Sequence, residues 1–227
     1  MKHFVFPRWA NRARNLAGIA LGLGPLYAFV LVYYIGSPRT TDVGYTPKQP
    51  VAYSHALHAG ELGMDCRYCH NTVQEAAHAA LPPTQTCMNC HQRIWTKSAK
   101  LLPVRESWAT GEPIEWIRVH DLPDYVYFNH SAHVGRGSGV GNDGVGVGCV
   151  ACHGRIDQMI EVEQVMSLSM AWCLECHRSP DQHLRPVGEV TNMTWQPPGG
   201  QDPVSYGASL RQKYDINPPT DCSTCHR

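Results

Sequence analysis

Residues 53–91 read Tyr53-Ser-His55-Ala-Leu-His58, then Cys66-Arg-Tyr-Cys69-His70, then Cys87-Met-Asn-Cys90-His91. Two cysteines separated by two residues and followed at once by a histidine are the attachment signature of c-type haem. The spacing suits this chemistry because two thiols about one helical turn apart can each bond one vinyl group, while the adjoining imidazole lies under the iron. Each such motif therefore predicts one covalently bound haem c with a proximal histidine.

The same arrangement returns further along the chain. It reads Phe128-Asn-His130-Ser-Ala-His133, then Cys149-Val-Ala-Cys152-His153, then Cys173-Leu-Glu-Cys176-His177. Cys66 and Cys87 are 21 positions apart and Cys149 and Cys173 are 24 apart, which indicates a duplicated two-haem unit. A fifth motif, Cys222-Ser-Thr-Cys225-His226, comes near the C-terminus.

All ten cysteines fall in these five motifs, so none remains for a disulfide or a catalytic thiol. A single motif of this kind could be a zinc half-site or a redox pair, but five motifs in a chain with 13 histidines favour five haem c groups. Haem attachment of this type places the folded part outside the cytoplasm. The predicted attachment residues are Cys66, Cys69, Cys87, Cys90, Cys149, Cys152, Cys173, Cys176, Cys222 and Cys225. The predicted proximal ligands are His70, His91, His153, His177 and His226.

The opposite face of each iron needs a distal ligand. The upstream histidines in each repeat stand at i, i+3, which on a helix puts both side chains on one face. A thioether ligand would raise the potential of one haem, and Met170, close to the fourth motif, is the preferred methionine, although core methionines usually only fill space. The distal candidates are thus His55, His58, His130, His133 and Met170, with His78 and His120 as alternates and His183 as a weaker one. His120 could instead bond a haem propionate.

The N-terminal region has the pattern of a membrane anchor. Residues 1–15 are basic with no acidic residue, and residues 16–35 are uncharged and long enough to cross a bilayer. A cleaved signal peptide is the competing interpretation, but the apolar stretch is long and lacks a small-x-small cleavage site. The basic flank predicts a cytoplasmic N-terminus and an exported haem domain.

The chain is accordingly divided by function. The predicted parts are a cytoplasmic tail (1–15), a transmembrane anchor (16–36), a tether (37–52), a first two-haem repeat (53–97), a connector (98–127), a second two-haem repeat (128–178) and an extended strap ending in the fifth motif (179–227). The predicted fold class is mainly α and irregular, a transmembrane helix plus a haem-packed multihaem cytochrome c domain with little regular secondary structure.

Three stretches carry further expectations. A short helix is predicted over residues 71–80, ahead of Pro82, and residues 180–221 show little helical periodicity. The glycine-rich stretch 135–148 fits a dinucleotide fingerprint on paper, but that fingerprint needs a following helix in a βαβ unit, and here a haem motif follows. It is predicted to be a surface loop. The formal net charge of zero gives no indication of nucleic-acid binding.

These features resemble a known family. The anchor, the twin histidine-and-haem units, the connector from Glu115 to His130 and the run from Leu168 to Arg178 look like the pentahaem cytochrome c subunit of alternative complex III, and the haem units resemble the cytochrome c7 and c3 group. The resemblance implies an electron-transfer subunit, without substrate chemistry of its own, of a quinol-oxidising respiratory complex in the bacterial inner membrane. Its implied partners are integral membrane quinol-binding subunits, an iron-sulfur subunit, and a periplasmic cytochrome c or terminal oxidase.

Two other functions remain open from sequence. The chain could be a stand-alone, single-anchor quinol dehydrogenase, for which Asp65 beside the first motif is a candidate acidic group. It could also be a reductase with one open iron, as in multihaem nitrite-reducing enzymes. The supply of candidate ligands, which exceeds the number of irons, argues against an open iron.

Overall fold

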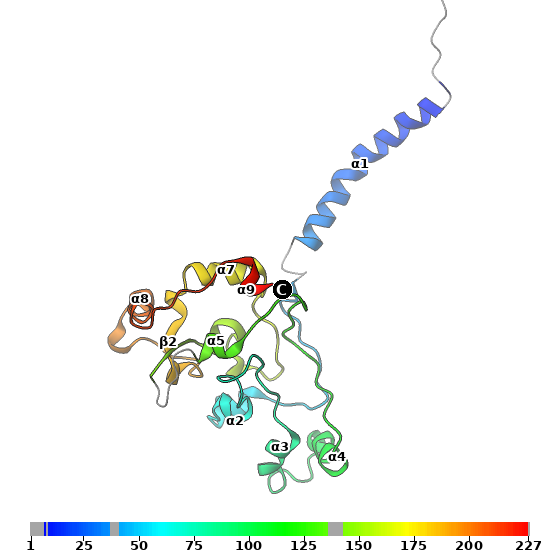
Figure 1. The fold of residues 1–227 in the computed structure, drawn as a ribbon. Coiled ribbons are helices and arrows are strands. Elements are labelled where there is room, and N and C mark those ends of the chain that lie inside the picture. The colour runs from blue at the N-terminus through cyan, green and yellow to red at the C-terminus, as the bar shows by residue number, and fades with distance from the viewer. Residues whose placement is uncertain (1–6, 8, 37–40, 136–142, 227) are drawn as a thin grey trace, which may run out of the picture. The chain divides into compact units, whose positions relative to one another are not determined.

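The structure is a computed structural model that describes residue 7 and residues 9–36, 41–135 and 143–226. The chain forms two compact units, one ending at Val43 and one beginning at Gly44 (Figure 1). The two units differ in composition: the described part of the first is mostly one long apolar helix, and the second holds all five cysteine motifs.

The first unit is built on helix α1, Trp9–Ile35. The 24 residues from Arg12 to Ile35 are long and apolar enough to cross a membrane. Large apolar side chains such as Leu21 and Val32 are exposed on it. The helix begins before the predicted span because alanine and arginine, which lie between Trp9 and Leu16, are good helix formers.

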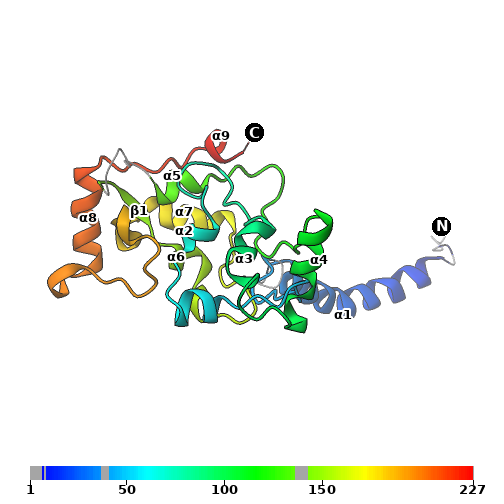
Figure 2. The same cartoon turned by 90° about the horizontal axis from the view of Figure 1, so that it is seen from below.

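The second unit consists of short helices joined by irregular segments. The α-helices are α2 (Cys66–Cys69), α3 (Thr84–His91), α4 (Leu102–Thr110), α5 (His130–Val134), α6 (Cys149–His153), α7 (Met170–Arg178), α8 (Pro203–Lys213) and α9 (Cys222–Cys225). The π- and 3₁₀-helical turns are η2 (Ala56–Glu61), η3 (Ala99–Leu101), η4 (Ile156–Gln158), η5 (Asp181–His183), η6 (Val187–Glu189) and η7 (Pro198–Gly200). Figure 2 shows α8 at one end of this unit and α3 with α4 towards the other.

The two strands of the described residues are β1 (Val145–Val147) and β2 (Leu184–Pro186), which pair antiparallel with Gly146 opposite Arg185. The predicted fold class, mainly α and irregular with one N-terminal apolar helix, is confirmed.

Among the described residues, apolar side chains form two small cores. One contains Val145, Leu184, Leu210 and Ile216, and the other contains Val51, Met88 and Val104. Ten apolar side chains are buried in the described part of the chain, which is few for a unit of this size. The rest of the apolar burial must come from elsewhere, as expected if porphyrin supplies it.

Three local predictions were wrong. Residues 71–80 form turns and bends because the Thr72 hydroxyl donates to the His78 carbonyl and accepts from the Ala80 N–H, in place of helical bonds. The segment 180–221 contains β2 and α8, which the proline-rich composition hid. Val145 and Gly146 are buried in β1, although residues 135–148 were expected to be surface loop; residues 136–142 lie outside the described residues.

The contact between α8 and η5 gives a prediction about stability. A Cβ on Gly207 would overlap the Asp181 carbonyl oxygen. Alanine is a better helix former than glycine by about 1 kcal/mol, but a backbone carbonyl cannot yield easily, so Gly207→Ala is expected to lower the free energy of unfolding by about 1–3 kcal/mol. Thermal unfolding of the holoprotein measures this change in the free energy of unfolding. Ser209→Ala, an exposed change on the same helix, should shift it by less than about 0.5 kcal/mol; equal shifts for both variants would contradict the packing argument.

Candidate haem sites

Each cysteine motif lies on a short helix. The cysteine pairs stand in α2, α3, α6, α7 and α9, so the two sulfurs of each pair are one turn apart on one face. Side chains fix where three of these helices begin: Asp65 accepts from the Arg67 N–H, Ser169 from the Trp172 N–H, and Asp221 from the Thr224 N–H. The cysteine spacing thus becomes the geometry that two thioether bonds to one porphyrin require.

Four of the five proximal histidines bond to a backbone carbonyl through Nδ1. The distances are 2.8 Å for His70 to Ala80 O, 3.1 Å for His91 to Ile94 O, 2.6 Å for His177 to Pro219 O and 3.2 Å for His226 to Tyr125 O. A carbonyl oxygen can only accept, so the proton is on Nδ1 and the lone pair is on Nε2. This is the tautomer of a histidine that ligates metal through Nε2. The fifth, His153, is treated below.

The distal candidates show the same arrangement. Nδ1 of His58 lies 2.9 Å from Ser54 O, that of His130 lies 2.9 Å from Ala77 O, and that of His133 lies 2.7 Å from Asn129 O. Nε2 is again left for a metal. His55 differs, because its Nδ1 is buried with no partner among the described residues.

The structure brings these histidines together in pairs. An imidazole nitrogen binds a first-row metal at about 2 Å, so two imidazoles on opposite faces of one iron have ring centroids roughly 6 Å apart. The centroids are 6.2 Å apart for His58 and His91, 6.0 Å for His133 and His177, and 6.4 Å for His130 and His153. Each of these pairs joins a distal candidate to the proximal histidine of one motif.

His55 is the fourth distal candidate, and His70 is the proximal histidine it adjoins. Burial lowers the pKa of His55 to about 4, and the nearby His70 is the next cause. Three motifs therefore have two imidazoles at the separation that ligation of one iron would require, and the pairing of His55 with His70 stays a prediction. In these three pairs the donors would fit the two positions that a haem leaves to the protein.

The two repeats place their aromatic residue in the same way. The Tyr53 ring lies edge-on to His55 at 4.8 Å and stacks on His58 at 4.5 Å. The Phe128 ring lies edge-on to His130 at 4.8 Å and stacks on His133 at 4.5 Å. An aromatic residue thus packs against both distal candidates of each repeat.

The electrostatic environment favours neutral ligands. Burial lowers the pKa of His153 to about 3 and raises the pKa of Cys149 to about 11 and that of Cys152 to about 12. A neutral imidazole and a neutral thioether tolerate such burial. Within the described ranges, no three His, Cys, Asp or Glu side chains converge on one point.

The remaining candidates are not paired in this way. Among the described residues, the His226 ring lies next to the Tyr125 ring, with ring centroids 5.8 Å apart. Met170 begins α7 and is 65% exposed. His78 lies close enough to His130 to lower the pKa of His130, although burial of His130 is the larger cause. Met170 and His78 both stay predictions for the fifth distal ligand. His183 bonds the Gln182 side chain at 3.1 Å.

Asp65, the acidic candidate of the quinol-dehydrogenase interpretation, is already engaged. Its carboxylate accepts from the Arg67 backbone and guanidinium and from the Thr191 hydroxyl. The Arg67 hydrogen bond is the main cause that lowers the pKa of Asp65 to about 2. Such a carboxylate is a poor acceptor for a quinol proton.

Sequence reasoning missed Arg185, which lies next to the third motif. Its side chain is 8% exposed, stacks on Trp195 at 5.0 Å and packs where a Cβ on Gly148 would overlap it. The partners come from distant parts of the chain, so no sequence signal could have singled this arginine out.

Comparison with known proteins found one similar curated sequence and no matching family model. The multihaem cytochrome c subunit of a menaquinone reductase from Nitratidesulfovibrio vulgaris (strain Hildenborough) is 32% identical over 115 residues, which is 49% of this chain and 55% of the relative. The chain thus spans about half the length of that relative. The attachment motifs, the paired imidazoles and this similarity together support a multihaem cytochrome c.

Proposed function

We propose that this chain is an electron-relay subunit of a quinone-linked respiratory complex, with five haem c groups and no substrate chemistry of its own. Haem c supplies reversible one-electron transfer at its iron. The chain's own residues hold the groups in a fixed row, supply the axial ligands and exclude water. The strongest support is that neighbouring motifs adjoin one another from one end of the second unit to the other.

The row begins with the second motif and continues through the first to the third. The Asn89 side chain of the second motif donates to the Tyr68 hydroxyl of the first at 3.2 Å. The first and third motifs are bridged by adjacent strap residues, since Thr191 bonds Asp65 at 3.1 Å and the Val190 carbonyl accepts from the Cys149 N–H at 2.9 Å.

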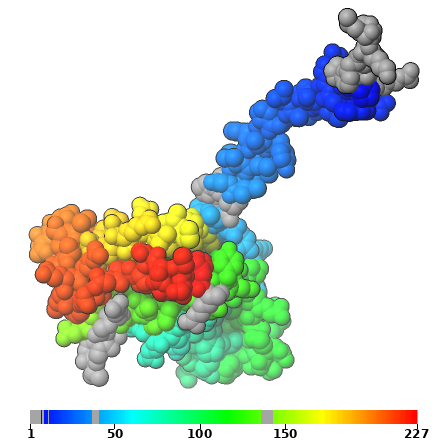
Figure 3. All heavy atoms as spheres, turned by 45° about the horizontal axis from the view of Figure 1, so that its top comes forward, coloured from blue at the N-terminus to red at the C-terminus, as the bar shows by residue number. Residues whose placement is uncertain are grey.

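The row then continues through the fourth motif to the fifth. Helix α5 links the third motif to the fourth, because its His130 lies 6.4 Å from His153 and its His133 lies 6.0 Å from His177, measured between ring centroids. The bond from His177 Nδ1 to the Pro219 carbonyl ties the fourth motif to the segment before α9. Figure 3 shows this C-terminal segment (red) alongside α7 (yellow). The proposed order is therefore second, first, third, fourth, fifth.

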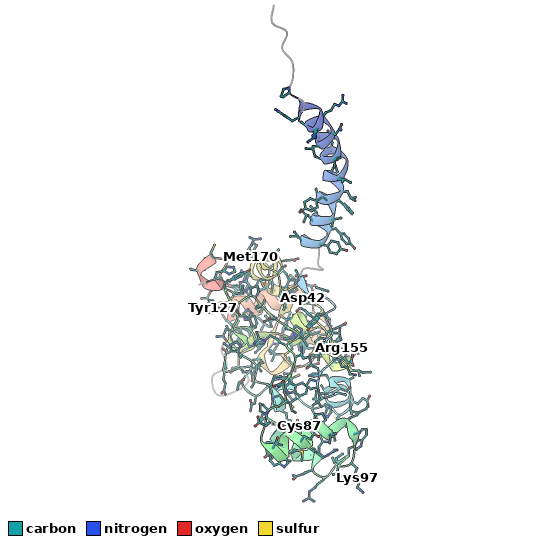
Figure 4. The ribbon with its side chains drawn as sticks, turned by 90° about the vertical axis from the view of Figure 1, so that its right-hand side faces the viewer. Asp42, Cys87, Lys97, Tyr127, Arg155 and Met170 are labelled. Carbon is teal, nitrogen blue, oxygen red and sulfur yellow. The ribbon has the colours of Figure 1, made fainter. Side chains whose placement is uncertain are left out.

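The ends of this row are far apart. Figure 4 shows Cys87, of the second motif, at the opposite end of the unit from Tyr127, whose N–H bonds the Cys225 carbonyl of the fifth motif. Cys90 and Cys222 are exposed, whereas the cysteines of the first, third and fourth motifs are partly buried. Electrons can thus enter near one end and leave near the other.

The finer assignment follows the resemblance to the pentahaem subunit of alternative complex III. In that assignment, membrane subunits oxidise quinol, an iron-sulfur subunit adjoins, and this chain passes electrons to a periplasmic cytochrome c or a terminal oxidase. The similar curated protein is a subunit of a menaquinone reductase, and its name favours a second candidate, in which electrons flow through such a row towards the quinone.

The direction can be tested on the complex purified through this chain. A menaquinol analogue is expected to reduce its haems within turnover time, and the isolated chain is expected to show no quinol oxidation. If quinol reduced the haems of the isolated chain, the chain would instead be a stand-alone quinol dehydrogenase. Reduction only from a soluble electron donor, followed by quinone reduction, would support the second candidate.

We propose that α1 is an uncleaved anchor in the bacterial inner membrane, with the haem unit in the periplasm. Replacing residues 1–43 by a cleavable export signal is expected to move the haem protein into the soluble periplasmic fraction, because the apolar surface of α1 is removed. Haem staining of fractions after an alkaline carbonate wash measures this. Full-length protein released by the same wash would contradict the anchor.

A further inference from the structure

The third motif differs from the other four in what its proximal histidine bonds. Nδ1 of His153 lies 3.4 Å from Nε2 of His120, and the two rings meet edge-on with centroids 4.5 Å apart. The proximal histidines of the other motifs bond backbone carbonyls. Only the third motif therefore has a proximal partner, among the described residues, that a point substitution can remove.

The protons of this pair can be assigned. His153 must keep the lone pair of Nε2 for iron, so its proton is on Nδ1 and this N–H donates. The acceptor is then the Nε2 lone pair of His120, whose own proton is on Nδ1. With one nitrogen accepting and the other protonated, His120 has no lone pair for an iron.

We infer that His120 is a positioning residue for His153 and not an iron ligand. It fixes the tautomer and the ring orientation of the proximal ligand and raises the basicity of that ligand, as acceptors behind metal-bound histidines do. A more basic ligand stabilises the oxidised iron, so His120 holds the potential of the third haem below the value it would otherwise have. His130, parallel to His153 within 8°, remains the distal partner of that motif. The inference goes beyond the relay and requires only that haem is attached at the third motif.

The test compares His120→Phe, which removes the acceptor but keeps a ring, with His120→Gln, whose amide oxygen can still accept. In His120→Phe, all five irons are expected to stay low-spin in electron paramagnetic resonance spectra. One of the five reduction potentials is expected to rise in a spectroelectrochemical titration, and His120→Gln should restore it. His183→Phe, at a half-buried ring bonded to Gln182, is the matched control.

Either of two results would overturn the inference. A high-spin signal in His120→Phe would make His120 an iron ligand. A potential that moves no more than in His183→Phe would mean that the bond has no role. If His120→Phe does not mature, His120→Asn, which is too short to reach His153, serves with the same expected results. None of these readouts depends on electron transfer to a partner, so failure of the proposed relay would be seen separately.

A different observation concerns the charge beside the same motif. Arg185 is 8% exposed, forms no ion pair with a carboxylate among the described residues, and leaves its buried Nε without a partner. Its Nη1 donates only to the neutral Asn192 carbonyl, at 3.1 Å. Burial of a guanidinium is costly, and Gly148 leaves the space for it beside Cys149.

We propose that Arg185 is a fixed cation that raises the reduction potential of the third haem. Reduction adds one negative charge to the iron, and a nearby buried cation stabilises the reduced form through a weakly screened interaction. Arg185 and His120 would then act on this haem in opposite directions.

Arg185→Gln is expected to lower one of the five potentials, while Arg185→Lys, which keeps the charge, should leave it near the original value. Arg211→Gln is the control, because the Arg211 charge is offset by Asp181 at 3.6 Å. If Arg185→Gln leaves all five potentials unchanged, or if Arg185→Lys lowers the same potential equally, the charge has no such role. If Arg185→Gln does not mature, the Lys variant and a salt titration of the wild-type potentials remain. A buried cation is weakly screened, so the potential of the third haem is expected to be insensitive to salt. A strong salt dependence of that potential would overturn the proposal.

Discussion

Replacing His133 by alanine is expected to turn one of the five low-spin irons high-spin. His133 and His177 have ring centroids 6.0 Å apart, and Nδ1 of each donates to a carbonyl, so both Nε2 atoms are free to bind one iron. Alanine removes the distal donor, and no other histidine ring among the described residues contacts His177. The fourth haem then becomes five-coordinate, which should also raise its potential and let it bind added imidazole or carbon monoxide.

Electron paramagnetic resonance and visible spectra of the oxidised protein measure this change. About one fifth of the iron should move to the high-spin signal, and added imidazole should return it to low spin. His183→Ala is the matched control, since His183 bonds Gln182 and is not paired with a proximal histidine in the described structure. A spectrum of His133→Ala that stays fully low-spin would remove this residue from the ligand set.

The sequence alone predicted the haem chemistry better than the pairing of its ligands. The attachment cysteines and proximal histidines follow from a contiguous five-residue pattern. The pairing of His58 with His91 joins a residue of η2 to a residue of α3. The pairing of His130 with His153 depends on a bond from His130 to the Ala77 carbonyl, 53 residues away. Such contacts come from long-range packing, which no local spacing encodes.

The failures of local prediction have physical causes too. The helix expected over residues 71–80 gave way because the Thr72 side chain took over backbone bonds. Strand β1 lies in a glycine-rich stretch that resembles a loop, yet Val145 is 1% exposed because β2, from a distant segment, covers it. His120 could not be assigned from sequence either, since ligand and positioning roles differ only in which atom its Nε2 faces.

Removing the third haem is expected to divide the row into two electrically separate halves. The third motif is the link between the first motif, which it meets through Val190 and Thr191, and the fourth, to which α5 joins it through His130 and His133. Cys149→Ser with Cys152→Ser removes both thioether bonds and should lower the intact mass by one haem. In the purified complex with quinol as donor, two of the four remaining haems should be reduced during turnover while the other two stay oxidised.

The control for this experiment removes a haem from the end of the row. Cys222→Ser with Cys225→Ser also lowers the mass by one haem, but the four remaining motifs still adjoin one another, so all four haems should be reduced together. The comparison separates loss of continuity from loss of a haem as such. Because the first and second motifs stand on one side of the break and the fourth and fifth on the other, the pair reduced by quinol identifies the end at which electrons enter. If all four remaining haems of the third-motif variant were reduced as fast as in the wild-type complex, the order second, first, third, fourth, fifth would be wrong, and another contact would have to connect the two halves.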